Sequence, residues 1–325
     1  MNVLILGGTQ FVGRHMVEEA LRRGHSVTLF HRGKTGAGLF AGDSRVAHIL
    51  GDRAGDHSEL SSGSWDAVVD CSAYETGAVE RACRVLKDRV GAYAFVSTIS
   101  VYAPALHADE NSPLEKLPEG VASDVYDREY YGALKALCED VVTSHFPDNS
   151  LNLRLGLQIG AYDHTDRFGD WIERIGRRSQ VIVPGGSPMT WQQIDAQDTA
   201  RFTLECLENK VYGTYNLTGE PAPMIEFLDG IRQVAHPGCE FVEKSPEWLQ
   251  EQGIEPWGEL TLWLREEDRD KLPITDISRA KSVGLQFRPL SETVNDAWTW
   301  LQTLDACRVR RGGLISEKED QLLAL

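Results

Sequence analysis

Apolar and polar residues alternate in regular blocks along the first half of the chain. Short continuous apolar runs predict buried strands at 3–6, 26–30, 46–50, 65–70, 92–97 and 151–155. Apolar positions spaced three and four residues apart predict helices at 12–22, 76–89 and 128–144. Buried strands that alternate with helices are typical of a parallel sheet covered on both faces.

The pattern loosens after about residue 160. Short strands are predicted at 180–183, 214–217 and 240–243, and helices at 196–208, 224–234 and 291–304. Five of the eight tryptophans lie at 248, 257, 263, 298 and 300, which indicates a second aromatic core. We therefore expect one domain over 1–160, to which later segments can return, and a smaller mixed α/β domain over 161–325. The charged tail from Arg308 onward is expected to be peripheral.

A glycine-rich segment separates the first predicted strand from the first predicted helix. Glycines there allow a tight turn and a close approach of the backbone to a pyrophosphate, and the helix N-terminus offers free N–H groups. A plain strand-to-helix turn is the alternative, but this position directly between strand and helix favours dinucleotide binding. We therefore predict a doubly wound, Rossmann-type sheet. The predicted cofactor loop is Gly7, Gly8, Thr9, Gln10, Phe11, Val12 and Gly13.

The end of the second predicted strand bears on the choice of cofactor. A carboxylate at this place binds a ribose 2′-hydroxyl, whereas an arginine accommodates a 2′-phosphate. Residues 31–34 read His-Arg-Gly-Lys and contain no acid, so we predict NADP in preference to NAD, with His31 and Arg32 in the cofactor site. After the third strand, Asp52 and Arg53 either flank the adenine or form an ordinary turn.

A tyrosine and a lysine on the helix predicted at 128–144 are candidates for proton transfer. Tyr131 and Lys135 are four residues apart, so their side chains share one face of the helix. A tyrosine with a pKa of about 10 is a poor base at neutral pH, but a nearby ammonium and an oxidised nicotinamide stabilise its phenolate. The alternative is a tyrosine that only packs in the core. The order of glycine loop, fifth strand and this helix favours a general acid/base pair.

Hydroxyl groups lie at the carboxyl end of the fifth predicted strand, at Ser97, Thr98 and Ser100. A hydroxyl at this edge faces the crevice in which α/β sheets bind ligands, and it can hydrogen-bond a reacting oxygen. The other interpretation is that these hydroxyls only cap the strand end.

The charge balance narrows the range of partners. The chain has 33 Lys and Arg against 49 Asp and Glu, a formal net charge of −16. An acidic chain repels nucleic-acid phosphates and anionic lipid, so we expect neither nucleic acid nor membrane as a partner. The six cysteines form no CxxC pair and are expected to be reduced, in the cytoplasm. No apolar stretch approaches the roughly 18 residues needed to cross a bilayer.

Two further groups of polar residues follow the sixth predicted strand. Asp163-His164-x-Asp166 has no additional ligands at metal-binding spacing, so it is interpreted as a polar loop and no metal is expected. Arg167, close to Arg154 and Trp171 in sequence, is a candidate partner for an anionic group of a substrate.

Together, GGTxFVG at 7–13, TxxVY at 98–102 and YGALK at 131–135 resemble the extended short-chain dehydrogenase/reductases, the NAD-dependent epimerase/dehydratase group. The GGTxFxG form is similar to a branch that includes chloroplast stem-loop RNA-binding proteins and bacterial reductases. The resemblance extends to about residue 305 through IDxxDTA at 194–200, YNLTG at 215–219, DISRA at 276–280 and RPL at 288–290.

The resemblance implies a role for each matching residue. Thr98 matches the catalytic Ser or Thr, and Tyr131 matches the acid/base. Lys135 matches its partner, which also touches the nicotinamide ribose. Gln10 departs from the pattern, because it stands where GxxGxxG has its middle glycine. The sugar dehydratases carry Asp-Glu directly after the threonine, whereas this chain has Ile99-Ser100, so dehydration is not expected.

We therefore predict an NAD(P)-dependent oxidoreductase acting on a hydroxyl or carbonyl carbon of a small molecule. A sugar or nucleotide-sugar substrate is implied by the resemblance alone, and a homodimer through the helices that flank Tyr131 is common among such proteins. One alternative is an NAD-dependent sugar-nucleotide epimerase, against which His31 and Arg32 argue. Another is a non-catalytic cofactor-sensing or RNA-binding protein, against which the net charge and the Thr98, Tyr131 and Lys135 set argue.

Overall fold

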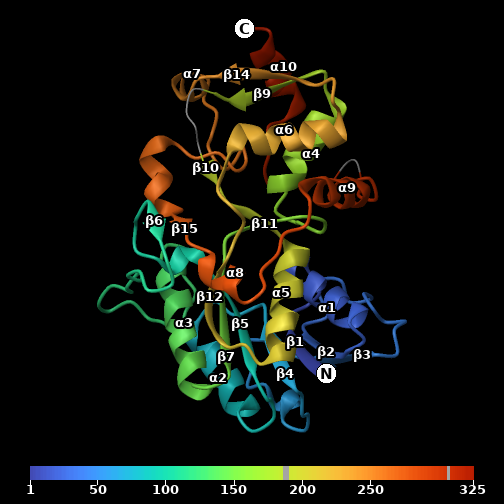
Figure 1. The fold of residues 1–325 in the computed structure, drawn as a ribbon, viewed down its shortest axis with the longest axis vertical. Coiled ribbons are helices and arrows are strands. Elements are labelled where there is room, and N and C mark those ends of the chain that lie inside the picture. The colour runs from blue at the N-terminus through green and yellow to red at the C-terminus, as the bar shows by residue number, and fades with distance from the viewer. Residues whose placement is uncertain (186–189, 306–307) are drawn as a thin grey trace. The chain divides into compact units, whose positions relative to one another are not determined.

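A computed structural model describes residues 1–185, 190–305 and 308–325 of the chain. The described residues form two compact units (Figure 1). Unit 1 comprises Met1–Gln158, Ala196–Gly219 and Asp270–Gln286. Unit 2 comprises Ile159–Asp195, Glu220–Arg269 and Phe287–Leu325. The chain therefore returns twice to unit 1 after first leaving it.

Within the described part of unit 1, seven parallel strands form one sheet in the order β3-β2-β1-β4-β5-β7-β12. The predicted Rossmann-type sheet is confirmed. Its direction of winding reverses between β1 and β4, and doubly wound sheets bind ligands outside the carboxyl ends of the strands at such a point. The strands are β1 (Asn2–Leu6), β2 (Ser26–His31), β3 (Val46–Leu50), β4 (Ala67–Asp70), β5 (Tyr93–Thr98), β7 (Ser150–Leu155) and β12 (Gly213–Leu217).

Helices cover both faces of this sheet (Figure 1). On one face, α1 (Phe11–Arg22) packs against α5 (Ala196–Asn209). On the other, α2 (Thr76–Leu86) packs against α3 (Tyr131–His145). The inner strands are apolar on both sides because each side meets a helix layer, whereas β3 at the edge is partly exposed. Smaller elements of unit 1 are η1 (Ser58–Leu60), η2 (Ile99–Val101), β6 (His107–Ala108), β15 (Ile274–Thr275) and α8 (Ser278–Ser282).

Unit 2 is a mixed α/β unit. Strand β9 (Gln180–Pro184) pairs in parallel with β14 (Glu240–Lys244), and β10 (Thr190–Trp191) pairs antiparallel with β13 (Ala222–Pro223). Helices α4, α6 and α9 pack on one another, and α10 packs on β9. The helices are α4 (Arg167–Arg177), α6 (Met224–Ala235), α7 (Pro246–Glu251), α9 (Leu290–Leu301) and α10 (Ser316–Leu323). The remaining segments lie where the chain passes from one unit to the other. They are β8 (Leu157–Ile159), β11 (Gln193–Asp195) and η3 (Glu266–Lys271).

Two expectations for unit 2 are wrong. Of the five tryptophans assigned to a second aromatic core, only Trp263 is buried, whereas Phe168 and Trp171 on α4 are buried completely. The C-terminal tail is not peripheral, because Glu319 is fully buried and accepts hydrogen bonds from Arg174 and from the backbone N–H of Ile182. In a stretch of sequence rich in charges, a carboxylate that is buried beside an arginine cannot be distinguished from one that stays in solvent.

No helix in the described ranges is both long and apolar enough to cross a membrane.

Candidate dinucleotide and proton-transfer site

The glycine loop between β1 and α1 has a backbone that only glycine fits well. Gly7 and Gly8 have φ of +105° and +83°, in a region that other residues rarely adopt. A Cβ atom on Gly8 would lie 2.6 Å from Leu29 Cδ2, and one on Gly13 would lie 2.9 Å from the backbone N of Gly8. The first turn of α1 therefore lies against the loop. This leaves a backbone cradle, next to a helix N-terminus, that suits an anionic group such as a phosphate.

The other residues of the loop differ in how far they face solvent. Gln10 is exposed and is the N-cap of α1, with φ −138° and ψ 144°, an extended backbone that any residue adopts. Its place in the GxxGxxG pattern therefore demands no glycine. Thr9 and Val12 are half-buried, and Phe11 is buried with its ring centroid 6.3 Å from that of His15.

The carboxyl end of β2 places His31 in the core and Arg32 in solvent. The backbone N–H of Gly33 donates to Nδ1 of His31 at 3.1 Å, so Nε2 of His31 carries the proton and donates to Nδ1 of His48 at 2.9 Å. Burial, together with the neighbouring His48, lowers the pKa of His31. His31 thus orders the turn, and Arg32 is the residue of this pair that is exposed at the strand end.

After the end of β3, Asp52 and Arg53, for which two interpretations were open, differ in their surroundings. Asp52 is exposed, and its carboxylate accepts the N–H of Ala54 at 3.0 Å in a tight turn. Arg53 turns inward and forms an ion pair with the fully buried Asp70 at the end of β4. Of the two, only Asp52 is exposed to solvent.

Thr98 ends β5 and is the N-cap of η2. Its Oγ1 accepts the backbone N–H of Ser100 at 3.1 Å and lies 3.2 Å from the Ser100 hydroxyl. Ser97, by contrast, donates to Glu139 inside the protein. The hydroxyls at this strand end therefore divide, with Thr98 and Ser100 together in the turn and Ser97 in the core.

The glycine of the YGALK motif brings α3 against this turn. A Cβ atom on Gly132 would lie 2.0 Å from the backbone oxygen of Ser100, so no other residue fits without movement of the backbone. Helix α3 begins at Tyr131 and packs on η2. The close contact at Gly132 thus places the N-terminal turn of α3, with Tyr131, beside the segment that carries Thr98. The Tyr131 ring also lies 6.4 Å, centroid to centroid, from that of Tyr74.

Lys135 is buried, and its ammonium joins strand β5 to the segment that follows β4. Nζ donates to the backbone oxygen of Ala73 at 2.8 Å and to that of Val96 at 2.6 Å, and lies 4.1 Å from the centre of the Phe95 ring. Burial lowers its pKa to about 8, although Asp70 and Glu139 act to raise it. An ammonium has three N–H groups, so one remains beyond these two backbone bonds.

A buried hydrogen-bond network joins residues that the sequence assigned only to motifs. The hydroxyl of Tyr102 donates to Oδ1 of Asn216 at 2.6 Å, and Nδ2 of Asn216 donates to the backbone oxygen of Asp276 at 3.0 Å. Arg154 donates to the same hydroxyl at 3.1 Å and pairs with the buried Glu139 at 2.8 Å. The VY, YNLTG and DISRA motifs thus tie the later segments of unit 1 to β5 and α3. Glu139, four residues beyond Lys135, is the member that helical spacing alone could have identified.

Several other candidates have structural partners. Asp163 accepts from the backbone N–H and the hydroxyl of Thr165 at 2.9 and 2.6 Å, as in a polar turn, and Asp166 pairs with Arg308. Arg154 is held in its ion pair, while Arg167 lies 4.8 Å from the centre of the Trp257 ring. Among the residues that the structure describes, no group of three or more His, Cys, Asp or Glu side chains could hold a metal ion.

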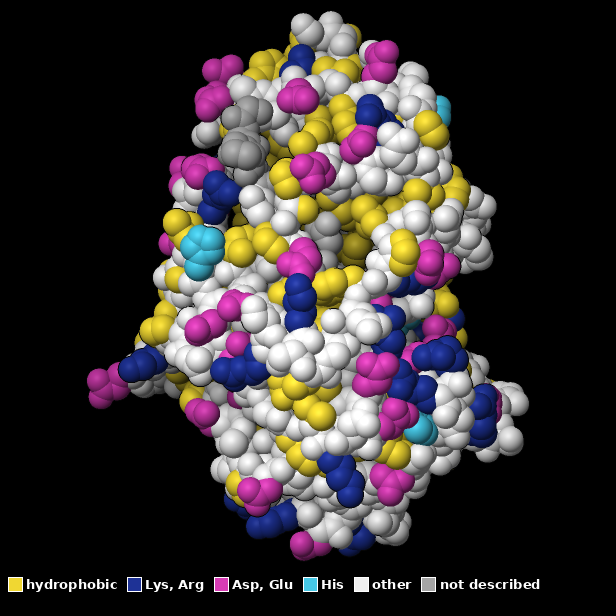
Figure 2. All heavy atoms as spheres, viewed as in Figure 1, with side chains coloured by type: hydrophobic (Ala, Val, Ile, Leu, Met, Phe, Trp, Pro, Cys, Tyr) yellow, Lys and Arg dark blue, Asp and Glu magenta, His cyan; other side chains and the backbone are white. Residues whose placement is uncertain are grey.

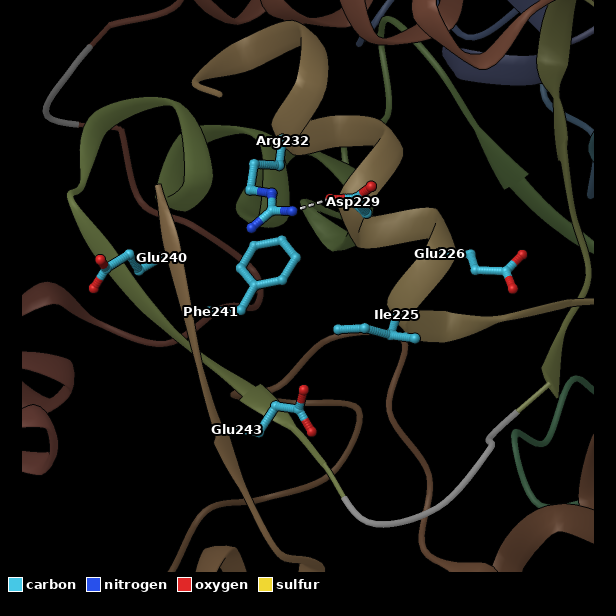
Figure 3. Close-up of a pocket in the computed structure, with 7 residues that line it drawn as sticks. All are labelled: Ile225, Glu226, Asp229, Arg232, Glu240, Phe241 and Glu243. Carbon is cyan, nitrogen blue, oxygen red and sulfur yellow. Dashed lines mark hydrogen bonds and ion pairs between the residues drawn. The ribbon is translucent and has the colours of Figure 1, made fainter. Parts of the chain in front are cut away.

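A surface hollow on unit 2 is separate from all predicted site residues (Figure 3). In it, the Arg232 guanidinium lies 4.7 Å from the centre of the Phe241 ring and pairs with Asp229. The remaining lining residues are mostly acidic and comprise Ile225, Glu226, Glu240 and Glu243.

The chain is similar to known proteins in sequence and in fold. No model of a known protein family matches the chain. The chain is 27% identical over 274 residues to a 2-alkyl-3-oxoalkanoate reductase of Stenotrophomonas maltophilia, covering 75% of this chain and 78% of that protein. It is 33% identical over 114 residues to chloroplast stem-loop binding protein of 41 kDa b of Arabidopsis thaliana, which is 31% of this chain and only 30% of that protein's length.

Solved structures with the same fold include sugar epimerases. The UDP-glucuronic acid 4-epimerase of Bacillus cereus, in complex with NAD, has a TM-score of 0.67 at 16% identity and covers 96% of this chain and 100% of that one. The UDP-glucose 4-epimerase of Bifidobacterium longum, in complex with NAD⁺ and UDP, has a TM-score of 0.66 at 16% identity, covering 93% and 98%. The chain thus has the same fold as these sugar epimerases, a doubly wound α/β fold as its motifs predict.

Proposed function

We propose that the chain is an NAD(P)-dependent oxidoreductase that binds a nicotinamide dinucleotide at the carboxyl ends of β1, β2, β3 and β4. The cradle formed by Gly7, Gly8 and Gly13 suits the pyrophosphate, and a side chain at these places would displace the loop or strain its backbone. Asp52, which faces outward at the end of β3, is placed to contact the adenine. The exposed Arg32 at the end of β2 favours a 2′-phosphate, and therefore NADP over NAD.

Proton transfer is assigned to Tyr131, with Lys135 as its partner. The observation that carries this proposal is the buried Lys135, whose ammonium is fixed by two backbone oxygens one helical turn from Tyr131. A fixed positive charge stabilises a phenolate, so Tyr131 can donate a proton to a substrate oxygen and take it back. Thr98, across the Gly132 contact, is placed to orient that oxygen. When bound, the nicotinamide supplies or accepts the hydride at the substrate carbon.

The substrate class is a carbonyl or carbinol compound, and a reductase is favoured over an epimerase. The relative matched over most of its length is named as a reductase, and Arg32 suits a cofactor that arrives and leaves in its phosphorylated form. The epimerase alternative draws on the solved structures of UDP-sugar epimerases with the same fold. A nucleotide-sugar substrate belongs with that alternative.

Parallel titration of cofactor-stripped protein with NADPH and NADH tests the proposal. We expect tighter binding of NADPH, and loss of that preference in Arg32→Ala. Lys87→Ala serves as the matched control, because Lys87 is an exposed cation at the C-cap of α2, outside the segment that ends β2. Tightly retained NAD that is indifferent to Arg32 would favour the epimerase, and a protein that binds neither nucleotide would refute the proposal.

The similarity to a stem-loop binding protein makes RNA binding the alternative from another class. Figure 2 shows Lys and Arg side chains interspersed with Asp and Glu over the visible face. Binding to RNA phosphates needs clustered cations and weakens steeply with salt. A salt-dependent shift of a stem-loop RNA in a gel, with no cofactor-dependent turnover of any carbonyl compound, would favour this alternative.

A further inference from the structure

The ion pair between Arg53 and Asp70 lies within unit 1, next to the proposed cofactor site, with Asp70 fully buried and Arg53 largely so. Asp70 is the last residue of β4, and none of its surface is exposed. Its Oδ2 accepts from the Arg53 guanidinium and, at 2.7 Å, from the Tyr93 hydroxyl, while Oδ1 accepts the backbone N–H of Ser72 at 3.3 Å. Both carboxylate oxygens are therefore engaged, and Arg53 supplies the positive charge.

His57 completes the surroundings of Arg53 without adding a charge. Nη1 of Arg53 donates to Nε2 of His57 at 3.1 Å, so that nitrogen is an acceptor and the ring is neutral. Burial and the Arg53 charge lower the pKa of His57 to about 4. The charges at this place are therefore those of Arg53 and Asp70.

The four residues that begin with Asp70 touch three parts of the proposed site. The N–H of Cys71 and the hydroxyl of Ser72 both donate to the backbone oxygen of Leu6, directly before the glycine loop, at 3.0 and 3.2 Å. The backbone oxygen of Ala73 accepts from Lys135 at 2.8 Å. Arg53 connects the same segment to the loop after β3. Residues 70–73 thus contact the strand end before the glycine loop, the loop after β3, and Lys135.

We infer that the Arg53–Asp70 pair holds residues 70–73 in place and sets the electrostatic environment of Lys135, so that both are positioning residues for the proposed chemistry. The inference rests on the proposed function, because it assigns these residues to that chemistry. The titration of Lys135 can be measured whether or not the proposed function is correct. A buried ion pair is weak support for stability, since apolar replacements of both partners are often neutral. Stability alone therefore does not explain an ion pair at this position, and a functional role is tested below.

The direction of the electrostatic effect follows from the two signs. The carboxylate of Asp70 favours the charged form of Lys135, and the guanidinium of Arg53 disfavours it. Burial is the larger influence and lowers the pKa of Lys135 to about 8. The titratable or charged groups that face Lys135 are Asp70 from β4, Arg53 from the loop after β3, Cys71 and Tyr74 beyond β4, and Cys138 and Glu139 from α3.

Direct titration of Lys135 separates electrostatics from mere structure. In protein labelled with ¹³C at lysine Cε, the Lys135 signal is identified by its loss in Lys135→Arg and followed by NMR against pH. Asp70→Asn leaves an unpaired guanidinium, so the midpoint should fall by about half a pH unit or more. The double variant Arg53→Met/Asp70→Asn removes both charges, so the midpoint should return toward the wild-type value.

Arg53→Met alone should shift the midpoint upward, because the unpaired Asp70 carboxylate favours the charged lysine. Opposite shifts in the two single variants are the result that a purely structural role does not give. Asp43→Asn, which breaks the exposed pair with Arg45, is the matched control and should leave the midpoint unchanged. An Asp70→Asn midpoint equal to wild type, or a double variant shifted further than the single one, overturns the inference.

Folding of the variants is checked by circular dichroism, because an unpaired buried charge is strongly destabilising. If Asp70→Asn is unfolded, Arg53→Met decides. The unpaired Asp70 carboxylate should raise the Lys135 midpoint, and an unchanged or lowered midpoint, or a protein that does not fold, refutes the inference. NADPH titration of wild type reports separately on the proposed function, because a wild type that binds no dinucleotide still yields a Lys135 titration.

Discussion

Replacing Gly13 by alanine probes the contact between the glycine loop and α1. The new Cβ atom would lie 2.9 Å from the backbone N and 3.0 Å from the Cα of Gly8. Both atoms belong to the backbone of the loop, so they cannot turn away as a side chain could. The loop and helix must separate by about half an ångström to restore an ordinary van der Waals distance.

The expected effects on folding and on binding differ in size. Alanine stabilises a helix by about 1 kcal/mol relative to glycine, and overpacking costs about 1–3 kcal/mol, so the free energy of unfolding should change by no more than about 2 kcal/mol. An N–H bond to a charged acceptor is worth about 1.5–3 kcal/mol, and a shifted loop loses part or all of one. Since 1.4 kcal/mol is tenfold in affinity, we expect NADPH binding to weaken by about tenfold or more.

The assay is a fluorescence titration with NADPH, accompanied by urea unfolding of the free protein. Gly42→Ala is the matched control, because nothing lies within 4 Å of a Cβ atom placed there, and it should bind as wild type. A Gly13→Ala protein that binds NADPH within about twofold of wild type would show that the loop does not hold the pyrophosphate. An equal loss in Gly42→Ala would show that the effect is not specific to the cradle.

Three further predictions follow from the same geometry. Tyr131→Phe removes the proton donor and should lower turnover of a carbonyl substrate by about 10²–10⁴-fold with NADPH affinity unchanged, whereas full turnover would exclude Tyr131 as the acid/base. Gly132→Ala puts a Cβ atom 2.0 Å from the Ser100 oxygen and should lower both the unfolding free energy and turnover; a crystal structure with α3 unmoved would contradict the argument. His57 has a pKa lowered from 6.5 to about 4 by burial, so the folded state binds fewer protons than the unfolded state between these values, and stability should fall with decreasing pH by up to about 1.4 kcal/mol per unit. His57→Asn, which suits the left-handed backbone at φ 60° and does not titrate, should show a shallower fall in urea unfolding from pH 7 to 5, and an unchanged slope would refute this.

Secondary structure in unit 1 was predictable because it depends on neighbours in sequence. Continuous apolar runs gave the parallel strands, and the glycine loop was placed correctly between β1 and α1. Some boundaries moved, since α3 begins at Tyr131 rather than at 128 and β4 at Ala67 rather than at 65. Helix ends depend on caps and on tertiary contacts, such as that of Gly132 with Ser100, which the apolar period does not record.

The sequence alone determined the sheet, the glycine loop and the spacing of Tyr131 and Lys135, because these follow from residue periods and turn chemistry. Tertiary structure decided which charged groups are buried. Arg53 is 17 residues from Asp70, and Glu319 is 145 residues from Arg174, yet each pair is buried. A charge enters the core only where an opposite charge or a hydrogen-bonding partner compensates for its lost hydration, as the backbone oxygens of Ala73 and Val96 do for Lys135. That partner is supplied by the fold and not by the adjoining sequence.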